Sequence, residues 1–296
     1  MGYSARYHAA SLVAVFVALA VGILIGAGLG DDLVSGTEEN LRESLEGDIE
    51  NARGEADELS LELDRERAFS SRAYPALVGD LLEGRRVGVL ALGGLPSDVS
   101  GDIESALDPT GADLVEVAVV RRPPDVAALT SELGPESAKA LEDDPVVELE
   151  RLGRVLGEQF VLGRGRLLRR MRDNLFSRSS GEGGRLQGVV IYRAPLGDLE
   201  GSERAESDSL EAGLTDGVAG SGVPVVGVER SDASESSIGF YGPFEVATVD
   251  SVNLVSGRVA MVFALLGADG DFGLKETADS LLPELLTRSR GGQGGS

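Results

Sequence analysis

The residues best placed to do chemistry form a glycine-rich turn. Val87–Gly94 reads Val-Gly-Val-Leu-Ala-Leu-Gly-Gly, and Ser97 and Asp98 follow it. A strand that ends in glycines before a helix can present backbone N–H groups to an anion. The run has neither the dinucleotide fingerprint nor the phosphate-loop lysine, so a simple tight turn is the alternative. Because ligands of open α/β sheets bind beyond the carboxyl ends of the strands, a small ligand is expected at Gly93, Gly94, Ser97 and Asp98.

A second candidate site residue is Asp250, which follows the short apolar run Val246–Val249 and precedes a helix-like segment. Its carboxylate either contacts a ligand at the same edge of the sheet or caps the following helix, a common role for aspartate. Asp269 and Asp271 resemble a fragment of a calcium loop, but the remaining ligand positions do not follow. The residues therefore leave any metal ligands unknown, and no cofactor is evident.

The residues needed for familiar catalytic sites are missing. The chain has no cysteine and a single histidine, His8, which lies at the edge of an apolar segment. This excludes Ser-His-Asp and Cys-His sites from the rest of the chain, and it removes the ligands of a zinc hydrolase. We therefore expect a protein that is not an enzyme.

Charge constrains the partners of the protein. The net charge of −23 argues against nucleic acid, because phosphate binding needs an excess of positive charge. Arginines nevertheless gather in one segment, where Glu158 and Asp173 are the only acids. Their expected counter-charge is the segment 38–67, with 12 acids and four arginines, within one chain or between chains. An anionic lipid or a cell-envelope polymer is the alternative partner. The clustered arginines are Arg151, Arg154, Arg164, Arg166, Arg169, Arg170, Arg172 and Arg178.

An uncharged segment near the N-terminus predicts a membrane helix. Ala9–Leu29 has 21 residues without a charge, enough to cross the roughly 30 Å core of a bilayer. A cleaved signal peptide is the alternative, but its apolar region usually runs only about 7–15 residues. Arg6 precedes the helix and the next basic residue is Arg42, so the positive-inside rule places the bulk of the chain outside the cytoplasm. We expect an anchor at residues 1–30 in the plasma membrane or cell envelope.

Residues 31–72 are predicted to form a helical coiled-coil stalk. Apolar or small residues recur there in steps of four and three, as in a heptad seam. Gly22 and Gly26 in the membrane helix form a small-xxx-small face that also suits dimerisation. We therefore expect a homo-oligomer, with packing of the stalk on its own domain as the alternative. The seam residues that carry this expectation are Leu45, Ile49, Leu59 and Leu63.

Beyond Tyr74 and Pro75, which break the helical pattern, runs of β-branched residues alternate with amphipathic segments. This alternation predicts an α/β domain over residues 73–287, with a largely parallel sheet flanked by helices. Glycine-rich residues 288–296 are expected to be a disordered tail. Strands are expected at 86–92, 114–120, 188–192, 223–228 and 246–249, and helices at 98–107, 146–176, 203–218 and 252–266.

Two segments resemble a known family. The first is the start of the apolar helix, Arg6–Gly22, and the second is the run Thr248–Asn253 with Gly257–Ala260. Both resemble the actinobacterial MctB-like copper transporter family, and the order of anchor, coiled coil and α/β domain fits as well. The resemblance implies a channel or efflux component of the envelope that limits intracellular copper. This resemblance is the only reason to expect copper as a partner of the protein.

The chain contains few of the side chains that usually bind copper. Copper(I) favours thiolate and thioether ligands and copper(II) favours imidazole, whereas this chain offers His8 and the methionines Met1, Met171 and Met261. Two other functions stay open beside copper transport. One is a non-catalytic oligomeric scaffold of the envelope, and the other is an α/β module that senses a small ligand.

Overall fold

The protein is described by a computed structural model that covers residues 4–284, with side chains placed at residues 7–26 and 44–284. The tail predicted at residues 288–296 lies outside the described residues. The chain divides into two compact units, Met1–Phe69 and Ser70–Ser296. The second is called the globular unit below.

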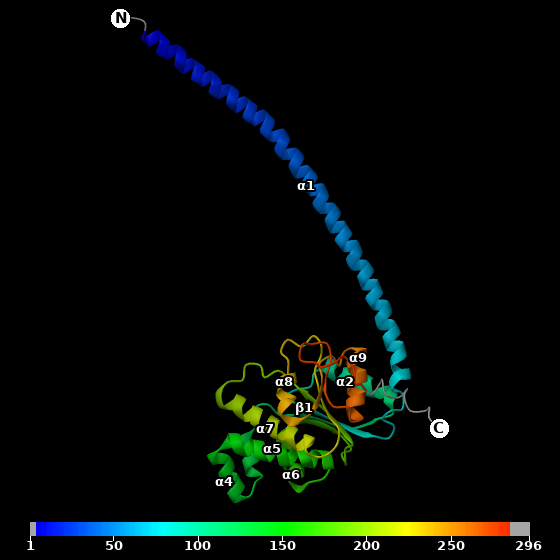
Figure 1. The fold of residues 1–296 in the computed structure, drawn as a ribbon. Coiled ribbons are helices and arrows are strands. Elements are labelled where there is room, and N and C mark those ends of the chain that lie inside the picture. The colour runs from blue at the N-terminus through cyan, green and yellow to red at the C-terminus, as the bar shows by residue number, and fades with distance from the viewer. Residues whose placement is uncertain (1–3, 285–296) are drawn as a thin grey trace. The chain divides into compact units, whose positions relative to one another are not determined.

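The N-terminal apolar helix is confirmed. Helix α1 begins at Ser4 and ends at Val78, and its segment Tyr7–Gly26 has a mean hydropathy of 2.6 with no residue buried (Figure 1). By length and composition this segment can cross a membrane. A coiled coil needs a partner helix, so the coiled-coil nature of the stalk stays a prediction.

The expected helix break at Tyr74 and Pro75 is wrong. Helix α1 continues through Pro75, whose carbonyl accepts a hydrogen bond from Gly79 N at 2.9 Å. Packing compensates for the N–H that proline lacks. Tyr74 and Val78 are buried among the apolar residues of the globular unit, and the Tyr74 hydroxyl donates to the Ala106 carbonyl at 2.6 Å. The last turns of the helix therefore belong to the core.

The globular unit is an α/β domain with a mostly parallel sheet, as predicted. Over the described residues the strand order is β3-β2-β1-β4-β5-β6-β7, and only the β2–β3 pair is antiparallel. The strands are β1 (Arg86–Leu92), β2 (Asp113–Val120), β3 (Phe176–Gly181), β4 (Gly188–Arg193), β5 (Val225–Val228), β6 (Ala247–Val249) and β7 (Asp271–Phe272). The helices are α2 (Ser97–Leu107), α3 (Val126–Ser131), α4 (Pro135–Asp143), α5 (Pro145–Leu162), α6 (Arg166–Leu175), α7 (Gly201–Ala219), α8 (Ile238–Tyr241) and α9 (Val255–Leu265), with 3₁₀ turns η1 (Asp108–Thr110) and η2 (Gly242–Phe244).

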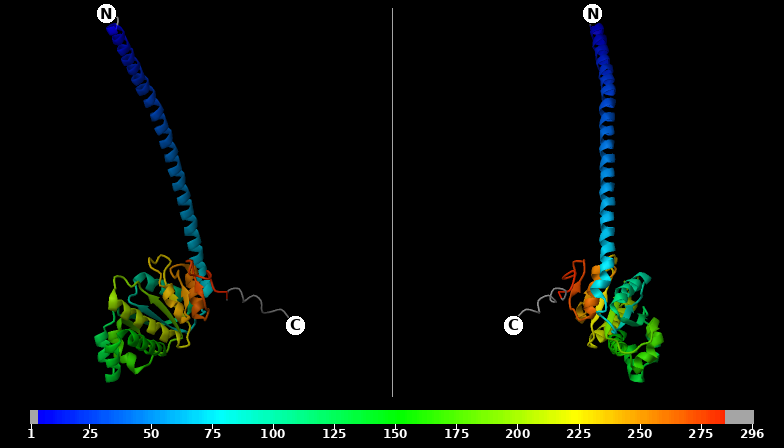
Figure 2. Two further views of the ribbon diagram at one scale, coloured as in Figure 1. Left: turned by 60° about the vertical axis from the view of Figure 1, so that its left-hand side comes forward. Right: turned by 90° about the vertical axis from the view of Figure 1, so that its right-hand side faces the viewer.

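Helices cover both faces of the sheet (Figure 2). One apolar cluster joins the sheet to α2, α9 and the end of α1, and the other joins it to the segment from α3 to α8. Strands β1 and β4 are therefore buried on both sides, which explains why they appear in the sequence as continuous apolar runs rather than alternating ones.

The single helix expected at 146–176 is instead two helices and the start of a strand. Helix α5 ends at Leu162, because Gly163 adopts a left-handed conformation with φ +60° and packs against the backbone of Gly184. Helix α6 then starts after Gly165, and β3 begins at Phe176, so Arg178 lies in a strand. The edge strands β3 and β7 and the helices α3 and α4 were not predicted.

Some of the clustered arginines pair with carboxylates inside the globular unit. Arg154 pairs with Asp216, Arg170 with Glu132 at 3.4 Å, and Arg172 with Glu116 at 2.5 Å. These partners lie on other elements of the same fold, and pairing of the remaining clustered arginines with an acidic stalk stays a prediction.

Candidate functional site

The carboxyl edge of the parallel strands is the natural place for a site. The chain leaves β1 for β2 on one side and later returns to β4 on the other, so β1 and β4 flank a topological switch point. In open α/β sheets ligands bind in the crevice beyond this point. The residues that follow β1, β4, β5 and β6 therefore form the candidate site.

The glycine turn after β1 is filled by a side chain of the protein itself. Gly93 has φ +86°, and a Cβ placed on it would lie 2.6 Å from Arg122 Nη1. The Arg122 guanidinium donates to the carbonyls of Leu92 at 3.0 Å and Ala194 at 2.9 Å. It thereby ties the ends of β1 and β4 together. Gly93 and Gly94 form a tight turn around an arginine and leave no space there for a phosphate.

A buried ion-pair network extends from this arginine. Glu211, whose side chain is 2% exposed, accepts from Arg122 Nε at 2.7 Å and from Arg193 Nε at 2.8 Å. Arg193 also pairs with Asp208 and stacks on the Phe240 ring, 4.1 Å from its centroid. Losing one member of such a network leaves a buried charge uncompensated, which is strongly destabilising. We interpret the network as structural.

Asp98 lines a cavity at this edge, whereas Ser97 is exposed at the start of α2. The Asp98 carboxylate lies 3.5 Å from Arg230 Nη1. Arg230 also pairs with Asp102 and, at 3.0 Å, with Asp232, and the hydrogen bond to Asp232 raises the pKa of Arg230. The guanidinium at the cavity wall is thus already neutralised by carboxylates of the chain.

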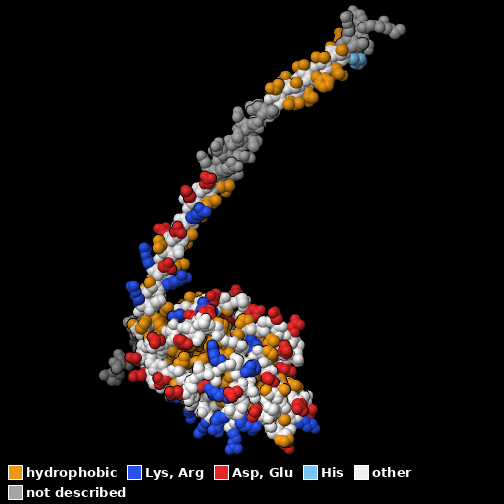
Figure 3. All heavy atoms as spheres, turned by 180° about the vertical axis from the view of Figure 1, so that it is seen from behind, with side chains coloured by type: hydrophobic (Ala, Val, Ile, Leu, Met, Phe, Trp, Pro, Cys, Tyr) orange, Lys and Arg blue, Asp and Glu red, His pale blue; other side chains and the backbone are white. Residues whose placement is uncertain are grey.

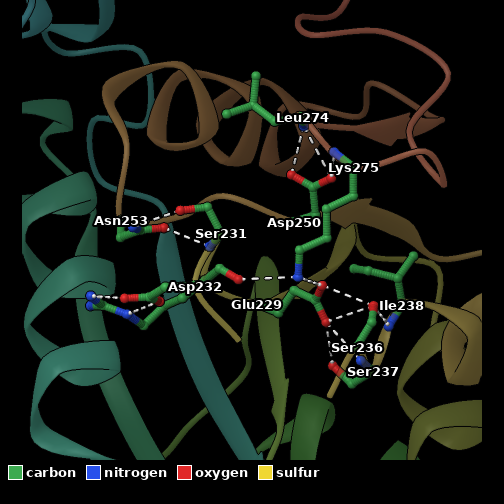
Figure 4. Close-up of polar contacts among 11 residues, drawn as sticks. Glu229, Ser231, Asp232, Ser236, Ser237, Ile238, Asp250, Asn253, Leu274 and Lys275 are labelled. Atoms are coloured by element: carbon green, nitrogen blue, oxygen red, sulfur yellow. Dashed lines mark hydrogen bonds and ion pairs between the residues drawn. The ribbon is translucent and has the colours of Figure 1, made fainter. Parts of the chain in front are cut away.

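Asp250 neither caps a helix nor lines this cavity. It is 1% exposed and accepts from the backbone N–H groups of Leu274 at 2.8 Å and Lys275 at 2.6 Å (Figure 4). Helix α9 begins five residues later with Leu254 as its N-cap residue, without a side-chain capping bond. Gly273, φ +149°, leaves the space that the carboxylate fills. Asp250 therefore holds the loop after β7, and the capping expectation is wrong.

Glu229 is the central acid of this edge, and the sequence reasoning missed it. It follows β5, is 2% exposed, and accepts from Ser236 Oγ at 2.9 Å and Ser237 N at 2.7 Å (Figure 4). Lys275 Nζ donates to it at 2.5 Å, which links Glu229 to the loop that Asp250 holds. A carboxylate directly after a buried strand was the available signal, because that position faces the carboxyl edge.

The cavity itself has a volume of about 300 Å³. Tyr192, at the end of β4, is 8% exposed, and within the described part of the chain its hydroxyl has no hydrogen-bond partner. Burial, assisted by the nearby Asp98 carboxylate, raises the pKa of Tyr192 above 10.0, so the phenol stays protonated and can donate to a ligand. The polar lining residues are Asp98, Tyr192, Arg193, Glu229, Arg230, Asp232, Ser234, Glu235 and Ser237.

The residues predicted to mediate oligomerisation are exposed in the part of the chain that the structure describes. A Cβ added at Gly22 or Gly26 would meet nothing within 4 Å. The seam residues of the stalk are half exposed or more, at 50% for Leu45 and Ile49, 60% for Leu59 and 54% for Leu63. These positions are available to a second helix, and their role stays a prediction.

The described residues contain no group of three or more His, Cys, Asp or Glu side chains that could hold a metal ion. Met171 and Met261 are fully buried in the two apolar clusters, and His8 is exposed beside the apolar segment. The donor set of the globular unit therefore does not match the soft ligands that copper(I) prefers.

Comparison with known protein families assigns the chain to one of them. Residues 3–283 match the family described as "Copper transport outer membrane protein, MctB". The match includes the apolar helix, the stalk and nearly all of the globular unit. No curated protein matches the sequence significantly. The chain belongs to the MctB family, whose description names copper transport and the outer membrane.

Proposed function

We propose that this protein limits intracellular copper as the membrane-anchored part of a channel or efflux assembly, with its globular unit outside the cytoplasm. The observation that carries the proposal is the family match, which extends over residues 3–283 and so includes the apolar helix. The segment Tyr7–Gly26 supports an anchor, because it is long and apolar enough to cross a bilayer.

Copper is the cargo in this proposal, and the chain's own residues suggest where it is handled. The described part of the globular unit offers no cluster of metal ligands, and its methionines are buried. The copper path is therefore assigned to the assembly of anchor helices rather than to a site inside the α/β domain. In this arrangement His8, exposed at one end of the span, is the imidazole that several copies would bring together.

The test is copper accumulation and tolerance in a deletion strain. The strain is complemented with the full-length chain and, separately, with a chain lacking residues 1–30 that carries an unrelated signal peptide. We expect the deletion to accumulate copper and only the anchored chain to restore tolerance. Normal copper handling in the deletion strain would refute the proposal, and rescue by the chain without its helix would refute the role of the anchor.

An oligomeric envelope scaffold is a second candidate, favoured by the exposed seam of α1. The seam residues follow the four-and-three spacing of a coiled coil and are at least half exposed among the described residues. Light scattering of the full chain in detergent should give a dimer or larger species, and Leu59→Ser with Leu63→Ser should give a monomer. A scaffold without a copper role predicts this oligomer together with normal copper handling in the deletion strain.

The small-ligand module remains a third candidate because of the Tyr192 cavity. A protonated phenol without a partner, nine-tenths buried in a cavity wall, is an available donor for a ligand. If a ligand binds there, Tyr192→Phe should weaken its binding without unfolding the protein.

A further inference from the structure

A second concave surface lies away from the carboxyl edge, on the face that carries α6. We call it the arginine hollow, a cavity of about 60 Å³ between the loop after α5 and the loop before β4. This is several times the ~10–15 Å³ that one water molecule needs. Figure 3 shows basic side chains gathered along the lower rim of the globular unit, where Figure 1 places α6. The lining of the arginine hollow includes Glu116, Gly163, Arg164, Arg169, Arg172 and Gly184.

The positive charge around the arginine hollow is largely unpaired. Within the described residues Arg164 and Arg166 contact no carboxylate, and Arg169 donates only to its own helix at Gly165 O. Arg86 beside the hollow donates to the carbonyls of Gly183 and Arg185. In a chain of net charge −23, this local excess of exposed guanidinium groups is unusual. It indicates an external anion as the missing counter-charge.

The backbone around the hollow suits an anion as well. Gly163 and Gly184 pack against each other without side chains, which keeps the floor open between Arg164 and Arg169. Helix α6 starts at this wall with no acidic residue in its first turn, and Gln159 Oε1 accepts from the N–H of Leu168 at 2.9 Å. The positive end of its dipole adds to the field of the arginines.

A buried carboxylate oxygen supplies an independent observation. Glu116 is 4% exposed and its Oε1 accepts from Arg172 Nη2 at 2.5 Å, but its Oε2 is buried and has no hydrogen-bond partner among the described residues. A buried acceptor left unpaired is destabilising. The site thus combines free cationic donors with one unmet acceptor, a pattern that matches a ligand carrying both anionic groups and hydroxyls.

We propose that the arginine hollow binds a soluble, phosphate-bearing glycan polymer. The phosphate groups would accept from Arg164 and Arg169, and a sugar hydroxyl would donate toward Glu116. A polymer is preferred to a lipid surface because no large apolar side chain is strongly exposed between Val155 and Leu274. Membrane-surface binding normally adds buried apolar area to electrostatic attraction. This inference does not depend on the copper proposal.

The test measures binding of the full-length chain in neutral detergent to phosphorylated dextran, with unmodified dextran as the neutral control. We expect binding only to the phosphorylated form. Arg164→Ser with Arg169→Ser should weaken it at least tenfold and flatten its salt dependence, because fewer counterions are released. The matched control is Arg53→Ser with Arg65→Ser on exposed stalk positions, which removes the same charge and should leave affinity unchanged.

Thermal unfolding of both double variants checks that the fold is intact. We expect unchanged melting temperatures, because all four arginine side chains are exposed. Absence of binding to phosphorylated dextran by the parent chain would overturn the proposal. So would equal losses in the two double variants, since the effect would then be one of net charge. Binding to phosphatidylglycerol vesicles but not to the polymer would assign the hollow to lipid headgroups instead.

Discussion

The tightest helix contact of the globular unit gives a sharp prediction at Gly153. Helices α5 and α7 approach so closely that a Cβ on Gly153 would lie 2.6 Å from Leu210 O and 2.8 Å from Leu214 N. Gly157, Gly213 and Gly217 face the opposing backbone in the same way. We predict that Gly153→Ala destabilises the protein although alanine is the better helix former.

The magnitude follows from two opposing terms. Ordinary Cβ contacts start at 3.4 Å, so the helices must separate by 3.4 − 2.6 = 0.8 Å. Overpacking of this kind costs about 1–3 kcal/mol, and the obstacle here is rigid backbone, which places Gly153→Ala near the upper end. Alanine returns up to about 1 kcal/mol of helix propensity. The net loss is therefore about 2 kcal/mol, or roughly 4–8 °C in Tm for a domain of this size.

Equilibrium urea unfolding and thermal melts of the full-length chain in detergent measure this loss. Gly101→Ala is the matched control, because Gly101 lies inside α2 and a Cβ there meets nothing within 4 Å. That substitution should stabilise the protein by up to about 1 kcal/mol. If Gly153→Ala proved as stable as the parent chain, the close approach of α5 and α7 would be refuted.

Three further predictions follow from buried polar groups. Arg122→Ala leaves Glu211 in the core with one partner fewer and should lower the unfolding free energy by about 3 kcal/mol in urea titrations. Asp250→Asn weakens two charge-assisted bonds to the loop after β7 and should speed proteolysis of residues 273–284 several-fold, whereas equal cleavage rates would contradict the holding role. Burial raises the pKa values of Tyr74 and Tyr192 above 10.0, so the folded chain keeps protons that the unfolded chain has released. Stability is therefore fully present below pH 10 and should fall as the pH rises above it, with tyrosinate absorbance of these two residues appearing only on unfolding.

The carboxyl edge shows which parts of a predicted site depend on residues far away in the sequence. The rule for open α/β sheets placed a site after the first strand, and Asp98 does line a cavity there. Arg122, from a different part of the chain, fills the turn formed by Gly93 and Gly94. Tyr192 lies at the end of β4 and Glu229 directly follows β5, and the sequence did predict both strands.

The sequence by itself determined the features that depend on the pattern of neighbouring residues. The uncharged N-terminal segment, the strands β1, β2, β4, β5 and β6, and the largely parallel sheet all follow from hydrophobic periodicity and turn residues. Family membership also follows from sequence, since the match extends over residues 3–283. The apolar segment and the strands depend on neighbours within a few residues along the chain.

Only the tertiary structure decided what depends on distant neighbours. The continuation of α1 through Pro75 depends on burial of Tyr74 and Val78, and the end of α5 at Gly163 depends on contact with Gly184. The partners of the arginines also depend on distant residues: Arg122 and Arg193 lie in a buried ion-pair network, whereas Arg164 and Arg169 line the arginine hollow. Charged side chains carry no local signal of their partners, and whether an arginine is neutralised depends on which carboxylate the fold places beside it.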